Sequence, residues 1–369
     1  MYLNRLHLLN FKNYPEAEVT LSSKINCLVG PNGAGKTNVL DAIYYLSFLK
    51  SYLNNTDQLN VRHGSDFFVV EGWFDRDGHE EHINCAVHKE QKKKARRNKK
   101  EYERLQDHIG LLPLVIISPY DKDLISEGSA LRRKFMDSVI SQYDAEYLDQ
   151  LVRYKRILDQ RNSLLKYFAQ NRSFDKDTLE VYNHQMAELS NAIYPKRKAF
   201  IESFVPLFSD IYKRISKRAE KVSLVYESDL EKCEMATLLS QNLSKDRVLQ
   251  FTSVGVHKDD LGFYLDQVPI RKIGSQGQQK TFVISLKLAQ FEYLHQQNGF
   301  KPILLLDDIF DKLDDQRVEA LVQMVNEHRF GQIFITDTHP ERTKEVIRSV
   351  NEESVIYLVD EGTISPMSK

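Results

Sequence analysis

The chain has 369 residues, of which 41% are hydrophobic and 28% are charged, a composition typical of folded rather than disordered proteins. The formal net charge of −1 excludes a general polyanion-binding protein on whole-chain charge alone. No apolar run approaches the roughly 20 residues that span a bilayer, and no signal-peptide pattern opens the chain. Its three cysteines are widely spaced and fit no metal site. We therefore expect a cytoplasmic protein, with no membrane segment and about two domains.

The beginning of the chain predicts an α/β arrangement. Residues 24–29 (KINCLV) form a short apolar run typical of a buried strand, and residues 38–48 carry apolar side chains at helical spacing. A glycine-rich turn separates them. Residues 67–87 alternate between apolar and polar, which predicts antiparallel strands punctuated by turns at Gly72 and at Asp77-Gly78.

The middle of the chain has a helical pattern. Apolar side chains recur every three or four positions over residues 147–168 and again over residues 179–200. The polar residues 170–177 lie between the two runs, so we predict an antiparallel helical hairpin. Pro195 and Pro206 are expected to end or kink its second helix.

The last third of the chain returns to an α/β pattern. Residues 302–306 (PILLL) and 332–336 (QIFIT) are short apolar runs typical of a parallel sheet buried on both faces. Helical patterns over residues 278–295 and 316–327 flank the first of them. Because no repeat and no flexible linker separates these regions, the helical block is expected to be inserted into an α/β domain.

A phosphate-binding motif lies between the first strand and the first helix. Residues 30–37 (GPNGAGKT) fit the pattern GxxxxGK[ST] completely, and a glycine-rich structural turn is the alternative. Glycines allow successive backbone N–H groups to surround a phosphate, and the helix dipole adds to the attraction. In such a loop Lys36 reaches the β- and γ-phosphates, and Thr37 ligates Mg²⁺. The motif comprises Gly30, Pro31, Asn32, Gly33, Ala34, Gly35, Lys36 and Thr37.

An acidic pair supplies the second half of a nucleotide site. The apolar strand that precedes it ends in Asp307 and Asp308. Asp307 is positioned to hold Mg²⁺, and Asp308 is positioned to orient an attacking water. The presence of a P-loop in the same chain is what supports these two roles. Lys36 and Asp307 are far apart in the sequence, whereas small kinases and GTPases complete their sites over a shorter stretch. This separation indicates a large insertion between the two halves.

Residues 275–279 (SQGQQ) lie at the start of the predicted helix over residues 278–295. They resemble the signature motif of the ABC-type ATPases of the SMC/Rad50 group, in which a hydroxyl, backbone amides and a helix dipole face a γ-phosphate. A serine that caps an ordinary helix is the alternative. Residues 311–314 (DKLD) resemble the D-loop of the same group. The resemblance implies nucleotide contacts from Ser275, Gln276, Gly277, Gln278 and Asp314.

Further stretches, in order along essentially the whole chain, resemble the RecF family of bacterial DNA repair and replication ATPases. They are residues 6–18 (LHLLNFKNYPEAE), 30–38 (GPNGAGKTN), 118–121 (SPYD), 128–137 (GSALRRKFMD), 154–166 (YKRILDQRNSLLK) and 255–260 (GVHKDD). The match adds Asn38 to the expected nucleotide contacts.

The chain departs from the family pattern at several positions. Val256 and Lys258 replace the proline and arginine of a GPHRDD element, and Lys312 stands where the D-loop usually has glutamate. Leu53 occupies a position where an arginine is expected. His339 follows the last predicted core strand, and both a switch histidine and an ordinary loop histidine are compatible with that place.

The resemblance implies an α/β fold: a P-loop ABC-type ATPase lobe with an inserted, mainly helical second lobe. We expect the first lobe over residues 1–115 and 250–369 and the second over residues 116–249. It also implies ATP held with Mg²⁺ between two subunits, Lys36 and Asp308 in slow, DNA-stimulated hydrolysis, and RecO- and RecR-like partners. Asp308 stands where many relatives place a glutamate, which predicts slow turnover.

Charge is unevenly distributed along the chain. Residues 89–104 include nine basic and three acidic residues, whereas residues 301–369 include eight basic and fourteen acidic ones. A basic run of this kind is commonly a solvated loop, but in a protein that resembles a DNA-binding ATPase it predicts sequence-independent phosphate contacts. The expected DNA contacts are Lys92, Lys93, Lys94, Arg96, Arg97, Lys99 and Lys100. No base-reading motif accompanies them.

Two other functional classes remain as alternatives. An ABC-type nuclease relative would need a carboxylate-rich nuclease domain, for which we expect no room. A structural DNA-binding protein with an inactive nucleotide site is disfavoured because Lys36, Thr37, Asp307 and Ser275 are all present.

Overall fold

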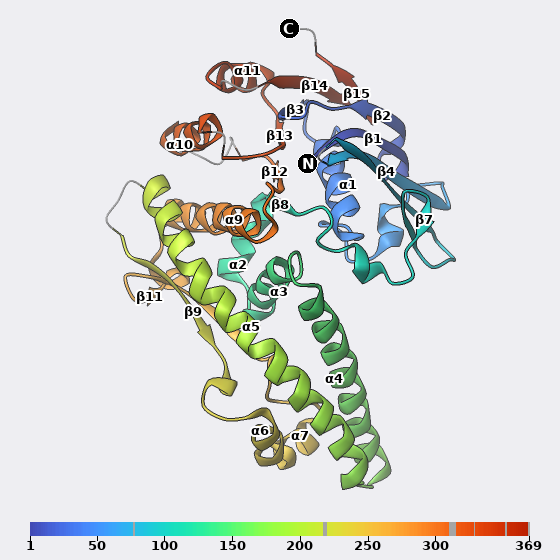
Figure 1. Cartoon of the computed structure of the whole chain (residues 1–369), viewed down its shortest axis with the longest axis vertical. Helices are drawn as coiled ribbons and strands as arrows, with labels where there is room; N and C mark the ends of the chain where they lie inside the picture. Colours follow the sequence, from blue (N-terminus) through green and yellow to red (C-terminus); the bar gives the residue numbers. More distant parts are fainter. Residues whose placement is uncertain (77, 217–219, 310–314, 328, 351–352, 368–369) are drawn as a thin grey trace. The chain divides into compact units, whose positions relative to one another are not determined.

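The computed structural model describes residues 1–76, 78–216, 220–309, 315–327, 329–350 and 353–367 (Figure 1). The chain divides into two compact units, each assembled from segments that are separated in the sequence. Unit 1 comprises Met1–Asp121, Arg214–Lys217 and Ile284–Lys369, and unit 2 comprises Lys122–Lys213 and Arg218–Val283. Most of unit 2 is thus inserted between the two halves of unit 1.

Unit 1 contains an antiparallel sheet with the strand order β2-β1-β4-β5-β6-β7. Its strands are β1 (Tyr2–Phe11), β2 (Tyr14–Thr20), β4 (Phe67–Arg76), β5 (His79–His88), β6 (Lys94–Arg97) and β7 (Lys100–Glu101). Along β4, Phe68, Val70 and Phe74 are buried on one face, as the alternating sequence pattern predicts. Gly72 lies inside β4 and not at the predicted turn. A glycine fits this strand position because a Cβ atom there would collide with the side chains of Leu46 and Phe74.

A second sheet of unit 1 is mostly parallel and has the order β15-β14-β3-β13-β12-β8. Only β15 runs antiparallel to its neighbour. Every residue of β3, β8, β12 and β13 is buried, which explains why these strands read as unbroken apolar runs. The strands are β3 (Ile25–Val29), β8 (Leu114–Ile117), β12 (Ile303–Leu306), β13 (Ile333–Asp337), β14 (Ser354–Asp360) and β15 (Thr363–Pro366).

Helix α1 (Lys36–Phe48) joins the two sheets of unit 1 into one core. Its Leu40 belongs to the same buried cluster as Leu6 and Phe68 of the antiparallel sheet and Leu28 and Phe334 of the parallel sheet. Packing on both sides therefore fixes the start of α1, where the phosphate-binding motif lies. The C-terminal part of the unit adds α10 (Asp315–Asn326) and α11 (Pro340–Arg348), and α9 (Gln276–Asn298) begins in unit 2 and ends in unit 1.

Unit 2 is mainly helical. Its α4 (Ala145–Asn171) and α5 (Lys176–Ser216) run antiparallel and form the predicted hairpin (Figure 1). A small antiparallel sheet has the order β11-β10-β9. The remaining elements are α2 (Asp123–Ser126), α3 (Ser129–Ile140), β9 (Val222–Glu227), α6 (Met235–Gln241), α7 (Leu243–Leu249), β10 (Asp260–Leu265), β11 (Val268–Pro269) and α8 (Ile270–Ile273).

The predicted effect of two prolines is wrong in one respect. Pro195 and Pro206 do not end the second helix of the hairpin, because α5 continues through both to Ser216. A proline inside a helix removes one backbone hydrogen bond, but Phe200, Phe204 and their neighbours bury this helix strongly enough to maintain it.

The predicted end of the inserted region also differs from the structure. We expected the second lobe to stop at residue 249, whereas unit 2 continues to Val283. The cause is strand pairing: β10 pairs along its whole length with β9, from Asp260 opposite Glu227 to Leu265 opposite Val222. Residues that follow the helical block in the sequence are therefore bonded to it.

Within the described part of the chain, no helix is both long enough and apolar enough to cross a membrane.

Candidate nucleotide-binding site

The phosphate-binding motif forms the turn between β3 and α1, as predicted. Gly30 and Gly35 have positive φ angles of 157° and 114°, in the region that favours glycine. Both also lie against other chain segments: a Cβ atom on Gly30 would collide with the Val359 carbonyl of β14, and one on Gly35 with the Asn13 side chain. Glycine is therefore required at both positions for two reasons: the backbone conformation, and the neighbouring segments that leave no room for a Cβ atom.

The turn between β1 and β2 is hydrogen-bonded to this loop. The Asn13 amide donates to the Ala34 carbonyl at 2.9 Å, and the Tyr14 hydroxyl donates to the Gly35 carbonyl at 3.0 Å. Asn38 in turn donates to the side-chain oxygen of Asn13 at 2.7 Å. Sequence reasoning missed this role of Asn13, although the residue lies within the N-terminal stretch that carried the family resemblance.

Lys36 is held across the loop. Its ammonium donates to the backbone carbonyls of Gly30 and Pro31, each at 2.9 Å, and its side chain is only 5% exposed. Both acceptors are neutral, so no carboxylate balances the charge through these bonds. A buried cation held by carbonyls at the N-terminus of a helix provides a strong attraction for an anionic ligand.

The structure brings the two predicted halves of the site together. The Thr37 hydroxyl donates to Asp307 at 3.0 Å, although the two residues are 270 positions apart in the sequence. Thr336, at the end of β13, donates to the same carboxylate oxygen at 2.8 Å. Thr336 was not predicted, and its position at the end of a core strand is the signal that would have found it.

Asp307 is buried, and burial raises the pKa of its carboxyl above the ordinary value. Hydrogen bonds from Thr336 and Thr37 act in the opposite direction but do not cancel this effect. The negative charge of this carboxylate is thus incompletely stabilised by the chain itself. A cation bound next to it would remove the imbalance.

Asp308 follows directly and has a φ angle of 45°, an unusual value for a residue with a side chain. Its backbone N–H donates to the Thr336 hydroxyl at 2.9 Å, so Thr336 binds both acidic residues. A backbone in this region costs about 1–3 kcal/mol and persists where surrounding contacts impose it, commonly at functional sites.

Asp337 at the end of β13 organises the segment that contains His339. Its carboxylate accepts hydrogen bonds from Arg342, Thr343 and the backbone N–H of His339. The Arg342 contact lowers the pKa of Asp337 despite the opposing effect of burial. His339 itself is exposed at the N-terminal end of α11, and its switch role stays a prediction.

The predicted signature motif lies at the start of α9. The Ser275 hydroxyl accepts from the Gln278 N–H at 3.2 Å, and the Gln278 side chain accepts from the Ser275 N–H at 2.7 Å. This reciprocal pair is a capping box, so Ser275 does cap the helix. Ser275 and Gln276 are also exposed. Their proposed contact with a nucleotide stays a prediction, and Asp314 lies outside the described residues.

The predicted DNA contacts over residues 92–100 are of two kinds: some lie next to carboxylates of the chain, and the others are exposed. Lys93 forms an ion pair with Asp57 at 2.8 Å, and Arg97 pairs with Glu81 through two hydrogen bonds. Arg96 lies 3.7 Å from Glu101. The other predicted DNA contacts are exposed, and they are Lys92, Lys94, Lys99 and Lys100.

Comparison with known proteins identifies the family. A family model described as the RecF/RecN/SMC N-terminal domain matches residues 2–365. A Flavobacterium johnsoniae protein named DNA replication and repair protein RecF is 55% identical to this chain, over 97% of this chain and 99% of the relative. The chain belongs to the RecF family.

Other RecF proteins and structures agree with this assignment. The Phocaeicola vulgatus RecF is 47% identical over 99% of this chain and 98% of its own length. A solved structure described as the recombination mediator RecF-ATP in the RecFOR pathway has a TM-score of 0.90 and 28% identity, over 100% of this chain and 98% of the other. A Pyrococcus furiosus Smc head domain, 17% identical, has a TM-score of 0.58 over 100% of this chain and 96% of its own, and supports the fold alone. The predicted α/β ABC-type ATPase fold is confirmed.

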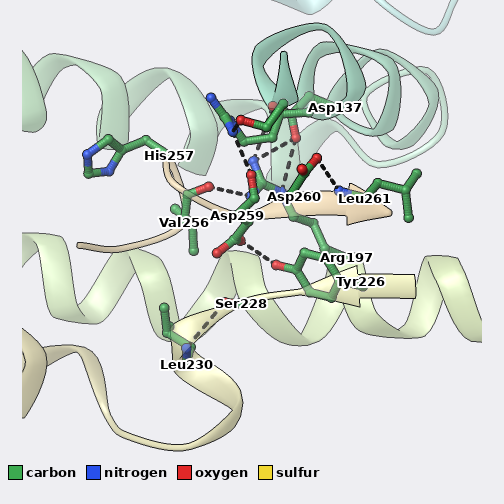
Figure 2. A network of polar contacts seen from close by, with 12 residues as sticks. Asp137, Arg197, Tyr226, Ser228, Leu230, Val256, His257, Asp259, Asp260 and Leu261 are labelled. Atoms are coloured by element: carbon green, nitrogen blue, oxygen red, sulfur yellow. Dashed lines mark hydrogen bonds and ion pairs between the residues drawn. The ribbon is translucent and has the colours of Figure 1, made fainter. Parts of the chain in front are cut away.

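Two RecF-like stretches meet inside unit 2 in a buried charge network (Figure 2). Arg197 of α5 is 1% exposed and bonds both to Asp137 at 2.9 Å and to Asp259 at 2.9 Å. Tyr226 also donates to Asp259. Burial by itself would lower the pKa of Arg197, but the surrounding carboxylates and tyrosines hold it well above the ordinary value.

The same two stretches are joined by a second pair. Arg132 donates from two nitrogens to both oxygens of Asp260, each at 2.8 Å, and Arg133 donates to the Asp259 carbonyl. The 128–137 and 255–260 stretches of this RecF-family chain therefore hold α3, α5 and β10 together. Val256, one of the departures from the family pattern, is fully buried, and its backbone carbonyl accepts a hydrogen bond from Arg197, a contact that any residue can make.

Proposed function

We propose that this protein is an ATP-dependent DNA-binding protein of DNA replication and repair. The contact between Thr37 and Asp307 carries the proposal, because it joins the phosphate-binding loop to the acidic strand. Relatives that match nearly the full chain are named DNA replication and repair protein RecF, and one solved relative is described with ATP. A chain with an intact loop, lysine and acidic strand is suited to bind the same ligand.

The residues present fit ATP together with Mg²⁺. Loop amides and Lys36 would bind the β- and γ-phosphates, and the oxygens of Thr37 and Asp307 would hold the metal. Among the described residues, no group of three His, Cys, Asp or Glu side chains is arranged to bind a metal by itself. This agrees with Mg²⁺, which commonly takes one or two protein oxygens and completes its ligands with phosphates and water. When bound, the metal would neutralise charge on the phosphates.

Slow hydrolysis is proposed to act as a switch. Asp308 would orient the attacking water, and its carboxyl group is one methylene closer to the backbone than that of glutamate. In a dimer of two copies, Ser275–Gln278 of one copy would complete the site formed by Lys36, Thr37 and Asp307 of the other. ATP binding would then close the dimer on DNA, and hydrolysis would release it. RecO- and RecR-like proteins are the proposed partners in loading a recombinase at single-strand gaps.

The exposed cations of β6 and β7 are the proposed DNA surface. Lys94, Lys99 and Lys100 are exposed on the outer strands of the antiparallel sheet or in the turn between them, where phosphates can approach. Lys93 and Arg97 already have carboxylate partners, so their contribution is expected to be smaller.

A mixing experiment tests the proposal. Lys36→Met removes the phosphate contact, and Ser275→Arg disrupts the signature motif. If the site is shared between two copies, a mixture of the two variants should hydrolyse ATP faster than either variant alone when DNA is present. Absence of recovery would contradict a shared site, and failure of the unmodified protein to bind ATP would contradict the proposed function as a whole.

A further inference from the structure

A long groove lies on the α4–α5 hairpin of unit 2, away from the residues assigned above. Its main hollow has a volume of about 680 Å³ and is lined almost entirely from α4, with Tyr182 contributed by α5. A second hollow of about 330 Å³ adjoins it, because Arg156 and Gln160 line both. The lining runs from Val152 to Tyr167, or about 22 Å at the helical rise of ~1.5 Å per residue.

The groove exposes apolar side chains, one of which, Leu164, also packs against the buried cluster of Leu165, Phe168 and Leu179. Val152 is 47% exposed and Tyr167 is 56% exposed, and Leu164 is half-buried between them. Val152 and Tyr167 are 15 positions apart, about four helical turns, so they lie toward the same side of α4 at the two ends of the lining. Apolar side chains that line a hollow together indicate a binding surface, whereas isolated ones do not.

Three cations gather at one end of the groove. Arg153, Lys155 and Arg156 are exposed lining residues. In the part of the chain that the structure describes, none of the three forms an ion pair within 4.0 Å. Their charge is therefore available to a binding partner. Such unpaired charges beside an apolar floor guide a partner with the opposite charge pattern.

We propose that this groove binds an acidic, amphipathic helix of another protein. A helix fits between two antiparallel helices by placing its ridge of side chains into their groove, with apolar residues on Val152, Leu164 and Tyr167. Acidic residues on its flank face Arg153, Lys155 and Arg156. About four turns of helix match the length of the lining.

The lining favours protein over nucleic acid. Asp159 lies in the middle of the groove wall, where a helix can place a neutral or basic residue, whereas a nucleic acid would bring a phosphate close to this carboxylate. Burying the apolar floor under aliphatic side chains also contributes favourable binding free energy, whereas contact with phosphates does not. A nucleic acid, by contrast, requires a continuous positive track of the kind that this wall interrupts.

The proposal is tested by selecting peptides against the intact protein. A displayed library of random segments about 20 residues long is panned against the unmodified chain and counter-selected against Arg156→Glu. Enriched peptides are expected to carry net negative charge and apolar residues at three- and four-residue spacing. One enriched peptide, labelled with a fluorophore, is then titrated by anisotropy.

We expect Arg156→Glu to weaken this peptide at least tenfold and Tyr167→Ala to weaken it severalfold. Lys166→Glu, an exposed change on α4 outside the lining, should leave the affinity within twofold. Circular dichroism verifies that each variant is folded. If Arg156→Glu does not fold, the affinity of Tyr167→Ala is used to test the proposal. Enrichment that does not depend on the groove, or displacement of the peptide by a DNA oligonucleotide, would overturn the proposal.

Discussion

The nucleotide site and the unit 2 network both bury charged side chains, but they balance those charges differently. Arg197 is surrounded by carboxylates of its own chain, whereas Lys36 donates only to backbone carbonyls. Asp259 accepts from Arg197 and Tyr226, while Asp307 accepts only from hydroxyl groups among its described contacts. Buried charge in unit 2 therefore serves to hold elements together, and buried charge in the nucleotide site is suited to a ligand.

The sharpest test of this difference is Arg197→Met. Removing one member of a buried ion network leaves Asp137 and Asp259 without their counter-charge and should lower the free energy of unfolding by about 3–5 kcal/mol. Urea denaturation followed by circular dichroism measures the loss. Lys198→Met, an exposed change one residue further along α5, is the matched control and should cost less than about 0.5 kcal/mol. If Arg197→Met and Lys198→Met lowered the free energy of unfolding equally, the proposed structural role of the network would be contradicted.

Lys36→Met should show the opposite pattern. The ammonium makes no ion pair through its two carbonyl bonds, so we expect the free energy of unfolding to change by less than about 1 kcal/mol. ATP affinity should fall about 100-fold or more, because a buried, charge-assisted contact with phosphate is lost. Calorimetric titration with ATP measures the second effect. A large loss of stability with unchanged ATP affinity would show instead that Lys36 stabilises the fold and does not bind the nucleotide.

Asp307→Asn should stabilise the free protein while it weakens binding of ATP with Mg²⁺. The folded-state pKa of Asp307 is raised, so the folded chain binds this proton more tightly than the unfolded chain does. Its contribution to stability therefore falls as pH rises through the interval between the two pKa values, and the neutral amide avoids that loss at pH 7. A higher urea midpoint at pH 7, together with ATP affinity that no longer depends on Mg²⁺, is the expected result. A lower midpoint would contradict it.

A pH effect is expected in unit 2 from His257. The Tyr154 hydroxyl donates to Nδ1 at 2.7 Å, and Nε2 donates to the Thr252 carbonyl at 3.1 Å, which fixes the neutral ring. Burial lowers the pKa of His257 to about 4. The unfolded chain takes up a proton near pH 6.5, so stability is fully present above that pH and is lost as pH falls toward 4.

The expected loss from His257 is roughly 1–3 kcal/mol between pH 7 and pH 4. Unfolding midpoints measured across this range should flatten in His257→Gln, whereas His184→Gln, an exposed change on α5, should leave the slope unchanged. An unaltered slope in His257→Gln would show that other groups cause the pH dependence.

The smallest effect is expected on the basic surface, where charge is neither buried nor tightly paired. Lys94→Glu combined with Lys100→Glu should reduce DNA affinity about tenfold and lower the slope of log affinity against log salt by about 2. Lys198→Glu is the control for a general change in net charge. Fluorescence anisotropy at several salt concentrations measures both quantities. Unchanged affinity and slope would exclude these strands as the DNA surface.

Local patterns predicted much of the nucleotide site. The phosphate-binding loop, the strand before Asp307 and the hairpin could each be predicted because spacing and glycine content report on nearby backbone. Sequence did not identify Asn13 or Thr336, because both act on partners that only the folded sheets bring close. Pro206 does not end α5 for a related reason: tertiary burial of this helix outweighs the local cost of proline.

The limit of unit 2 could not be predicted by a change in composition. It depends on β9 and β10 pairing across an intervening helical segment, and pairing partners are not encoded in either strand alone. Arg197 illustrates the same difficulty, since its partners Asp137 and Asp259 lie 60 and 62 positions away in the sequence and only the fold brings them beside it. The stretches that carried the RecF resemblance did identify these carboxylates, but not their function in packing.

The order of the parallel sheet has a consequence for synthesis of the chain. The strand β3, which leads into the phosphate-binding loop, lies between β13 and β14, so both of its neighbours are made roughly 300 residues after it. At ~5–20 residues per second, the ribosome needs roughly 15–60 s after β3 emerges before either neighbour exists. Most of unit 2 is complete during that interval. The segment that becomes β3 therefore has neither of its neighbouring strands to pair with until β13 has been made.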